Sequence, residues 1–354
     1  MTDGEGKPDK AIITPGISIR AAGPDDSANT RAIQWAVGWQ EAPDFHKYWP
    51  THDSDWIANR HFREFVAEVD GVVAGRLGLE AFVPPFAELV NLCVRPDFRR
   101  LGIGEMLTMA AQRTAARMGF PFLFLQTEMD NTAAHTLYAG QDWVPTAHGK
   151  MLRMVKLIDY PILASFKRTH PLNQYHCVPA IGAERTWEME WHAFVTDDYL
   201  RLRLESGASQ SDSAGMAPAI SGLDWRIKQG ARSLRISLER EPLTDIEPGH
   251  HVEIVINARN SGTRPEEGVF QMVLPHGVRV TSPNTNTTKS LLWSLEPGES
   301  LRLPVVIQIE PHFDASALWY LNYGSLPISV EAYWQDYRAL LSTSLPMAIP
   351  APLD

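Results

Sequence analysis

The chain has 354 residues, which is enough for about two domains. Its hydrophobic share of 44% and charged share of 21% are ordinary for a soluble globular protein, and its formal net charge of −10 argues against nucleic acid as a partner. No apolar run approaches the roughly 18 residues that a membrane-spanning helix needs, so no membrane partner is expected.

Residues 1–16 contain no apolar stretch of the kind found in signal peptides, and we expect them to form a disordered lead-in. The two cysteines, Cys93 and Cys177, are too few for a disulfide framework. Together these features predict a cytoplasmic protein.

Residues 17–160 show the pattern of a mixed α/β domain. Ile17–Arg20 alternates like a strand, and two strand-like runs flank Asp70-Gly71, which is a strong short signal for a hairpin. The order predicted here is one strand, two helices, three strands, a helix, a strand, a helix and a strand. This order indicates a mixed sheet with flanking helices.

A basic, glycine-spaced turn lies between a strand ending near Val94 and a long helical pattern. The turn reads Arg99-Arg100-Leu101-Gly102-Ile103-Gly104. Free N–H groups and the dipole at the start of a helix favour an anion, and glycines let a phosphate approach the backbone closely. The sequence therefore predicts a phosphate site at this turn.

Two motifs resemble those of the GNAT superfamily, the acyl-CoA-dependent N-acetyltransferases. The turn Arg99-x-x-Gly102-x-Gly104 is similar to the family pattern Gln/Arg-x-x-Gly-x-Gly/Ala. A second family pattern, Asn-x-x-Ala-x-x-Leu-Tyr, is matched by Asn131, Ala134, Leu137 and Tyr138. Both motifs occur in the expected order of strands and helices, and the likeness covers residues 17–157.

The resemblance implies a site for acetyl-CoA as co-substrate. The amides of the turn would hold the pyrophosphate, and the strand before it would offer unpaired backbone groups to the pantetheine arm, because the next strand splays away. The residues implied for cofactor binding are Leu92, Cys93, Val94, Arg99, Arg100, Leu101, Gly102, Ile103, Gly104, Asn131 and Tyr138. Asn131 would contact the pantetheine or cap its helix. Cys93 by itself is typical of a small buried residue.

Transfer of an acyl group from a thioester to an amine needs a neutral amine, a stabilised oxyanion and an acid for the leaving thiolate. The resemblance implies that Tyr138 is this acid, with packing on the cofactor as the structural alternative. For the base it implies a glutamate on the strand before the turn, and Glu88 is our candidate. Even spacing predicts that Glu88 and Leu92 face the same side of the strand. Further candidates for the base are Glu80, Asp53 and His52.

One position departs from the family pattern. After its tyrosine the family often has Gly-Phe, where this chain has Asp142-Trp143. The loss of the glycine is expected to change the geometry of that turn and to leave the cofactor motif intact.

The second half has a different character. Residues 161–183 show few periodic signals and are expected to form a connector. Residues 184–350 contain short alternating runs separated by turns such as Asn260-Ser261-Gly262 and Glu296-Pro297-Gly298, which indicates an antiparallel β-sandwich. The order of these turns resembles immunoglobulin-like modules of bacterial multidomain proteins. The expected role is binding, through a homodimer contact, a protein acceptor or a cover over the first site.

The sequence thus predicts a two-domain enzyme, a GNAT-like α/β domain followed by an all-β immunoglobulin-like sandwich. The predicted reaction transfers an acetyl group from acetyl-CoA to an unidentified amine by direct attack in a ternary complex. The alternative is a non-catalytic acyl-CoA-binding or sensing protein with the sandwich as its interaction module. No metal site is expected, because the His and Cys residues do not have ligand spacing.

Overall fold

The computed structural model describes residues 16–37, 61–81, 86–147, 151–170, 174–179, 186–193, 195–205, 219–240, 246–281, 290–313 and 325–347. Several predictions fall outside these residues: most of the lead-in, the second helix of the first domain, and the candidate bases His52 and Asp53. In the described part of the chain, no helix combines the length and apolar character that a membrane span requires.

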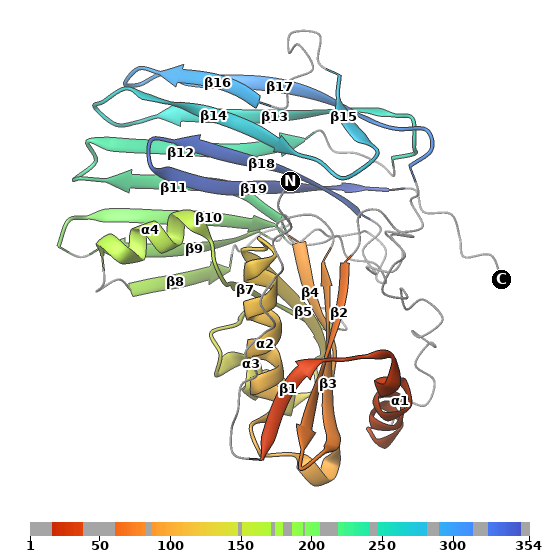
Figure 1. Ribbon diagram of the computed structural model, residues 1–354. Helices are drawn as coiled ribbons and strands as arrows, with labels where there is room; N and C mark the ends of the chain where they lie inside the picture. Colours follow the sequence, from red (N-terminus) through yellow and green to blue (C-terminus); the bar gives the residue numbers. More distant parts are fainter. Residues whose placement is uncertain are drawn as a thin grey trace, which may run out of the picture.

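The first half of the chain forms a seven-stranded sheet with the order β1-β2-β3-β4-β5-β7-β6 (Figure 1). The strands are β1 Ile17–Ala21, β2 His61–Val69, β3 Val72–Ala81, β4 Phe86–Val94, β5 Phe122–Glu128, β6 Val144–Ala147 and β7 Met151–Leu157. The pair β4–β5 is parallel, and the other neighbours are antiparallel. The predicted mixed sheet with a crossover is therefore confirmed.

The predicted hairpin joins β2 to β3. Val69 pairs with Val72, so Asp70 and Gly71 form a two-residue loop. Both take positive φ values, 50° and 79°, as the favoured hairpin turns require. The Asp-Gly signal in the sequence thus has the geometry that it predicts.

Helices cover both faces of this sheet. The helices α2 Ile103–Arg117 and α3 Thr132–Ala139 pack on one face, where Leu107 and Ala111 contact apolar residues of the strands. On the other face, α1 Ser27–Ala36 places Ile33 against Val66 and Cys93. We call these the α2 face and the α1 face of the sheet.

The second half forms two antiparallel sheets that pack as layers (Figure 1). The larger sheet has the order β15-β17-β13-β12-β11-β10-β9-β8, and the smaller has the order β16-β14-β18-β19. The strands are β8 Gln174–Pro179, β9 Thr186–Ala193, β10 Asp198–Glu205, β11 Ala219–Ile227, β12 Arg232–Arg240, β13 His251–Asn260, β14 Glu266–Val273, β15 Val278–Val280, β16 Ser290–Leu295, β17 Ser300–Ile309, β18 Ser325–Trp334 and β19 Tyr337–Pro346.

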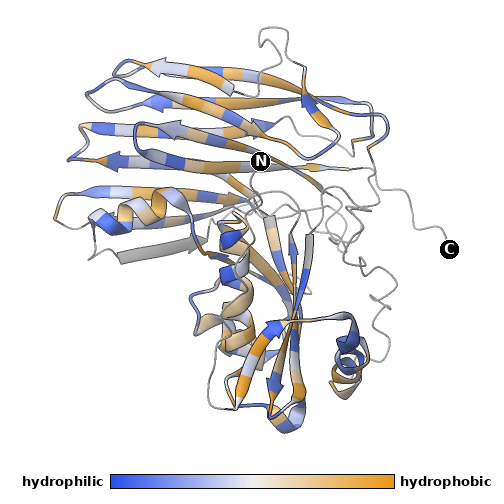
Figure 2. Cartoon of the chain, in the orientation of Figure 1, coloured by the Kyte–Doolittle hydropathy of each residue, from blue (hydrophilic) through white to orange (hydrophobic). Residues whose placement is uncertain are grey.

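Apolar and polar residues alternate along many of these strands (Figure 2). In β9 every second residue is buried, and β10 shows the same alternation. This period of two gives each strand one apolar face, so two sheets can enclose a common core. The structure confirms an all-β region with antiparallel sheets, and the likeness to immunoglobulin modules stays a prediction.

The segment that was expected to be an irregular connector contains ordered elements. Residues Pro161–Thr169 form helix α4, and Gln174–Pro179 form β8, the edge strand of the larger sheet. The short helix begins with a proline in its first turn and buries Ile162, Leu163 and Phe166 on one side. This helix was not predicted, because only nine residues carry its pattern.

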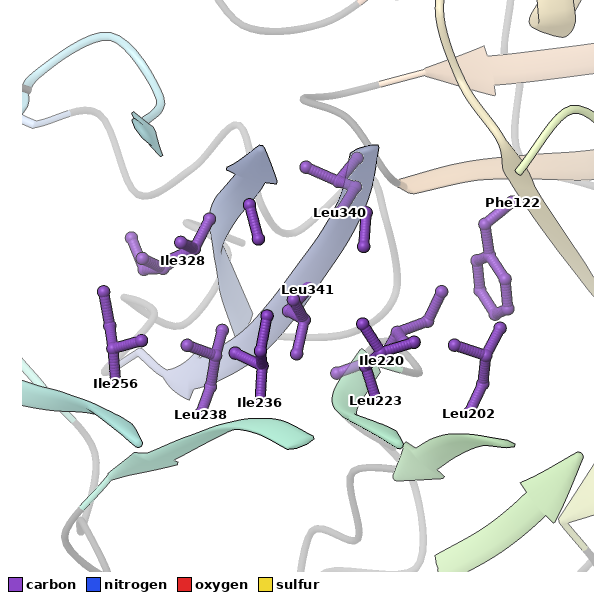
Figure 3. Packing of buried hydrophobic residues seen from close by; sticks show 14 of the residues in the cluster. Phe122, Leu202, Ile220, Leu223, Ile236, Leu238, Ile256, Ile328, Leu340 and Leu341 are labelled. Atoms are coloured by element: carbon purple, nitrogen blue, oxygen red, sulfur yellow. The ribbon is translucent and has the colours of Figure 1, made fainter. Parts of the chain in front are cut away.

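One apolar core continues from the first sheet into the β-sandwich. Phe122 and Phe124 of β5 belong to the same cluster as Leu202 of β10 and Ile220 of β11. Figure 3 shows Phe122 next to Leu202, Leu223 and Ile220. The α1 face of the first sheet is therefore covered at β5 by the second half of the chain, which packs against this region directly.

Candidate functional site

The parallel strands β4 and β5 stay paired for only part of their length. Their register runs from Phe86 opposite Phe122 to Leu89 opposite Leu125. Beyond this point β4 continues to Val94 and pairs with β3 alone. The backbone of β4 after Leu89 therefore has an edge that β5 does not occupy, which is the splayed geometry that the sequence analysis expected.

A β-bulge interrupts β4 at this opening. The register shifts between Arg76 and Gly78 of β3, whose partners on β4 are Cys93 and Val90, so β4 carries one extra residue. Asn91 has a φ of 56°, and such positive values are uncommon outside glycine. The bulge reverses the alternation of side chains along the strand.

Because of this bulge, the prediction that Glu88 and Leu92 face the same side is wrong. Leu92 packs in the cluster of the α2 face. Glu88 lies opposite Glu80 on β3 and opposite Phe124 on β5, whose side chain belongs to the other face. Both carboxylates are buried, with 6% of each residue exposed. The candidate base therefore lies on the α1 face.

Cys93 also lies on the α1 face, against Ile33 of α1. Only 3% of the residue is exposed, and burial raises the pKa of its thiol to about 11. A buried thiol of this kind is not a nucleophile at neutral pH. The geometry agrees with the interpretation of Cys93 as a small packing residue.

The turn after β4 leads directly into α2. Arg100 and Gly102 have φ values of 65° and 78°, and Gly102 is the N-cap of the helix. The first helical hydrogen bond runs from Met106 N to Gly102 O, and no side chain caps the start. The amides from Gly102 to Glu105 consequently have no acceptor within the helix, which is the arrangement that binds anions.

Two glycines let the start of α2 approach its neighbours. A Cβ on Gly75 of β3 would lie 2.9 Å from Ile103 Cγ2, and one on Gly104 would lie 3.3 Å from Leu137 Cδ2. The turn itself carries positive charge in two exposed residues, Arg99 and Arg100, and Arg99 Nε donates to Val94 O at 3.3 Å. The structure thus brings the turn residues, β4 and α3 together at one place.

The second motif lies on α3, which packs on the same face as α2. Asn131 is its N-cap, and its Oδ1 accepts a hydrogen bond from Ala134 N at 3.1 Å. The structure therefore shows the capping role for Asn131. Tyr138 is 6% exposed, and its ring packs against Trp143 with 5.7 Å between centroids.

Burial raises the pKa of the Tyr138 hydroxyl well above its ordinary value. A tyrosine is protonated at neutral pH in any case, so Tyr138 has a proton to donate, and burial makes this proton harder to release. Tyr138 lies on the α2 face and Glu88 on the α1 face, so the two candidates are on opposite faces of the sheet.

The turn after Tyr138 keeps a geometry that suits glycine. Asp142 has a φ of 61°, in the left-handed region that Asp tolerates better than most residues. Three contacts hold this turn: Trp143 N donates to Tyr138 O at 3.1 Å, Lys156 Nζ to Gln141 O at 2.7 Å, and Gln112 Nε2 to Gln141 Oε1 at 3.1 Å. Asp142 therefore holds a backbone conformation that glycine adopts more readily than other residues do.

One pair of charged residues in this region was not predicted from the sequence. Arg76 of β3 and Glu64 of β2 form an ion pair inside the sheet's α1 face, and each side chain is 1% exposed. A signal was present, because Arg76 is the one charge within the apolar run VVAGRLGL. Among the described residues, no group of His, Cys, Asp and Glu could hold a metal ion.

Residues 29–142 match the model of the acetyltransferase (GNAT) family. This match confirms the prediction of a GNAT acetyltransferase domain in the first part of the chain and supports an acyl-CoA-dependent N-acyltransferase. No curated protein matches the chain.

Solved acetyltransferase structures are similar to about 40% of the chain. PaiA N-acetyltransferase from Thermoplasma acidophilum, in complex with coenzyme A, is 18% identical over 40% of this chain and 98% of its own, with a TM-score of 0.32. The ribosomal-protein-S18-alanine N-acetyltransferase from Escherichia coli is 18% identical over 40% and 94%, with a TM-score of 0.34. Ard1 from Thermoplasma volcanium is 20% identical over 40% and 98%, with a TM-score of 0.35.

Proposed function

We propose that the protein transfers an acetyl group from acetyl-CoA to an amine, by direct attack of the amine within a ternary complex. The observation that carries this proposal is the opening between β4 and β5 at Leu89, which ends beside the uncapped start of α2. An extended pantetheine arm fits such an opening by pairing with the free edge of β4, and a pyrophosphate fits the free amides of the turn.

The two faces of the sheet would then have different tasks. The acceptor amine would approach from the α1 face, where Glu88 can take its proton, directly or through a water. An N–H group on the free edge of β4 would donate to the thioester oxygen as negative charge develops there. Tyr138, protonated on the α2 face, would give its proton to the departing thiolate of coenzyme A.

In this sequence the amine nitrogen forms the new bond to the acetyl carbon, and the bond from that carbon to sulfur breaks. The amine loses one proton to Glu88, and the thiolate gains one from Tyr138. Glu88, a buried carboxylate on the α1 face, is the residue that we assign to the first task. No covalent enzyme intermediate is needed, which agrees with the buried thiol of Cys93.

The test is thiol release from acetyl-CoA in the presence of a panel of amines. We expect Tyr138→Phe and Glu88→Gln to lower the turnover rate by about 100-fold or more, as loss of a general acid or base does. Tyr199→Phe and Glu190→Gln are matched controls, because both residues lie on strands of the β-sandwich. Rates that are unchanged in both test variants would show that the catalytic assignment is wrong. Coenzyme A binding without turnover on any amine would identify a binding module instead.

A further inference from the structure

A buried guanidinium on the α1 face has no use in the reaction described so far. Arg76 is 1% exposed and lies on β3, directly opposite Cys93 of β4. Its Nε is 2.6 Å from Oε1 of Glu64, which is also 1% exposed. The two groups touch as an ion pair.

This ion pair leaves most of the hydrogen-bonding capacity of Arg76 unused. Among the residues that the structure describes, neither Nη1 nor Nη2 has a hydrogen-bond partner, although both atoms are buried. Burying donors of a charged group without acceptors costs free energy, and native proteins rarely retain such a group without a purpose. Among the described residues, Glu64 is the acceptor beside this guanidinium, and Nη1 and Nη2 remain available for a further acceptor.

The charge of this pair also points to an anion. Burial raises the pKa of the Glu64 carboxyl to about 7, against the lowering effect of Arg76 and with a further rise from Asp26. Near neutral pH a share of the Glu64 groups is protonated, so the guanidinium is only partly neutralised. A second carboxylate beside Arg76 would neutralise the rest of its positive charge.

The position of Arg76 relates it to the candidate base. On β3, Arg76, Gly78 and Glu80 alternate onto the α1 face, and their partners on β4 are Cys93, Val90 and Glu88. Glu64 lies opposite Gly78, which has no side chain, so the Arg76 side chain reaches it diagonally across the sheet. Arg76 thus shares the α1 face with Glu80 and Glu88, and its guanidinium is directed toward β2.

From this arrangement we infer that the acceptor is a small amino-acid-like molecule, whose carboxylate binds Arg76 and whose amine faces Glu88 and the opening of β4. This inference rests on the proposed function and names the substrate class of the same site. A carboxylate fits a guanidinium through two parallel hydrogen bonds, which would satisfy Nη1 and Nη2 together. Two carboxylates on the neighbouring strands favour the cationic end of such a molecule before its proton is removed. Because Arg76 is shielded from solvent, the acceptor has to open this face locally on entry.

The test compares acceptors that differ only in the carboxylate, such as tyrosine with tyramine and lysine with cadaverine. For at least one pair we expect kcat/KM of the unaltered protein to favour the amino acid by about 10- to 100-fold, the effect of one hydrogen-bonded charged contact. Arg76→Lys should remove most of this preference by raising KM for the amino acid and leaving KM for the amine unchanged. Arg235→Lys is the control, because Arg235 pairs with Asp224 on the β-sandwich.

The same pairs are also measured by calorimetry in the presence of coenzyme A, which separates the two proposals. Preferential binding of the amino acid without turnover would refute the proposed reaction and support the Arg76 site. The inference would be overturned if both members of every pair bound equally and reacted at equal rates, or if the amine were preferred. This comparison uses the unaltered protein, so it does not depend on whether the Arg76 variant folds.

Discussion

The hydroxyl of Tyr160 donates a 2.7 Å hydrogen bond to the backbone carbonyl oxygen of Leu340, 180 residues further along the chain. Tyr160 directly precedes α4, and Leu340 lies on β19, an edge strand of the smaller sheet. The bond is buried, and it joins the end of the first region to the last strand of the second.

Tyr160→Phe tests how much this hydrogen bond contributes to the stability of the protein. The variant leaves a buried carbonyl oxygen without its partner, so we expect the free energy of unfolding to fall by about 1–3 kcal/mol. Urea denaturation followed by circular dichroism measures the change. Tyr199→Phe is the control, because Tyr199 is only half-buried and its hydroxyl bonds the side chain of Asp224 and not a backbone carbonyl. An equal loss in both variants would contradict the special role of the buried bond.

The common core predicts that the two halves unfold together. Phe122 of β5 is fully buried in the cluster that contains the strands of the β-sandwich. We expect one cooperative thermal transition for the whole chain, and a loss of about 3–5 kcal/mol in Phe122→Ala from transfer and cavity costs. Val195→Ala, at a residue that is 89% exposed, should change little. Two separate transitions in the unaltered protein would show that the halves are independent.

Local signals predicted the first sheet well. The Asp-Gly hairpin, the glycine-spaced turn and the helix cap at Asn131 each depend on a few adjacent residues, and all three have the predicted geometry. The separation of β4 from β5 could be predicted only from the resemblance to a family. The bulge at Asn91 cannot be predicted from the alternation of residues along the strand. The prediction that Glu88 and Leu92 face the same side was wrong for this reason.

Contacts between distant segments could not be predicted. The sequence around Phe122 does not indicate that its side chain packs against Leu202. Both residues belong to apolar runs, and such runs show that a residue is buried but not which residues it contacts. The Glu64–Arg76 pair depends on strand register, which brings these two residues within diagonal reach on neighbouring strands only once the hairpin has formed. The helix α4 was not predicted because its pattern is short. It packs against β19, and tertiary packing of this kind supplies most of the stability of short helices in proteins.

Gly102 is the N-cap of α2 and lies in the turn that we predict to bind an anion. Its φ of 78° disfavours any side chain, yet a Cβ there would meet nothing within 4 Å. Gly102→Ala should therefore cost about 1–2 kcal/mol of stability through backbone strain alone, and relaxation of the turn should weaken coenzyme A binding. Gly71→Ala is matched, with a φ of 79°, open space and a place in the β2–β3 hairpin. We expect a similar stability loss there but an unchanged calorimetric affinity, and equal affinities in the two variants would argue against the turn as the phosphate site.

The buried Glu64 predicts a pH dependence of stability. Burial raises the pKa of its carboxyl from an ordinary value of 4.5 to about 7, although Arg76 opposes the shift. Between these values the folded protein binds more protons at this group than the unfolded chain does. The free energy of unfolding should therefore fall as pH rises through the window from about 4.5 to 7, by at most about 1.4 kcal/mol per pH unit.

Glu64→Gln removes this titration while it keeps the size of the side chain. The free energy of unfolding of the unaltered protein and the variant is measured by urea denaturation at several pH values from 5 to 8, a range chosen around the pKa of about 7. The difference between the two should change in favour of the variant as the pH rises, because only the unaltered protein has to bury a negative charge at high pH. A difference that stays constant, or that changes in favour of the unaltered protein, would mean that Arg76 holds Glu64 ionised throughout, and that the pair is electrically neutral before any acceptor binds.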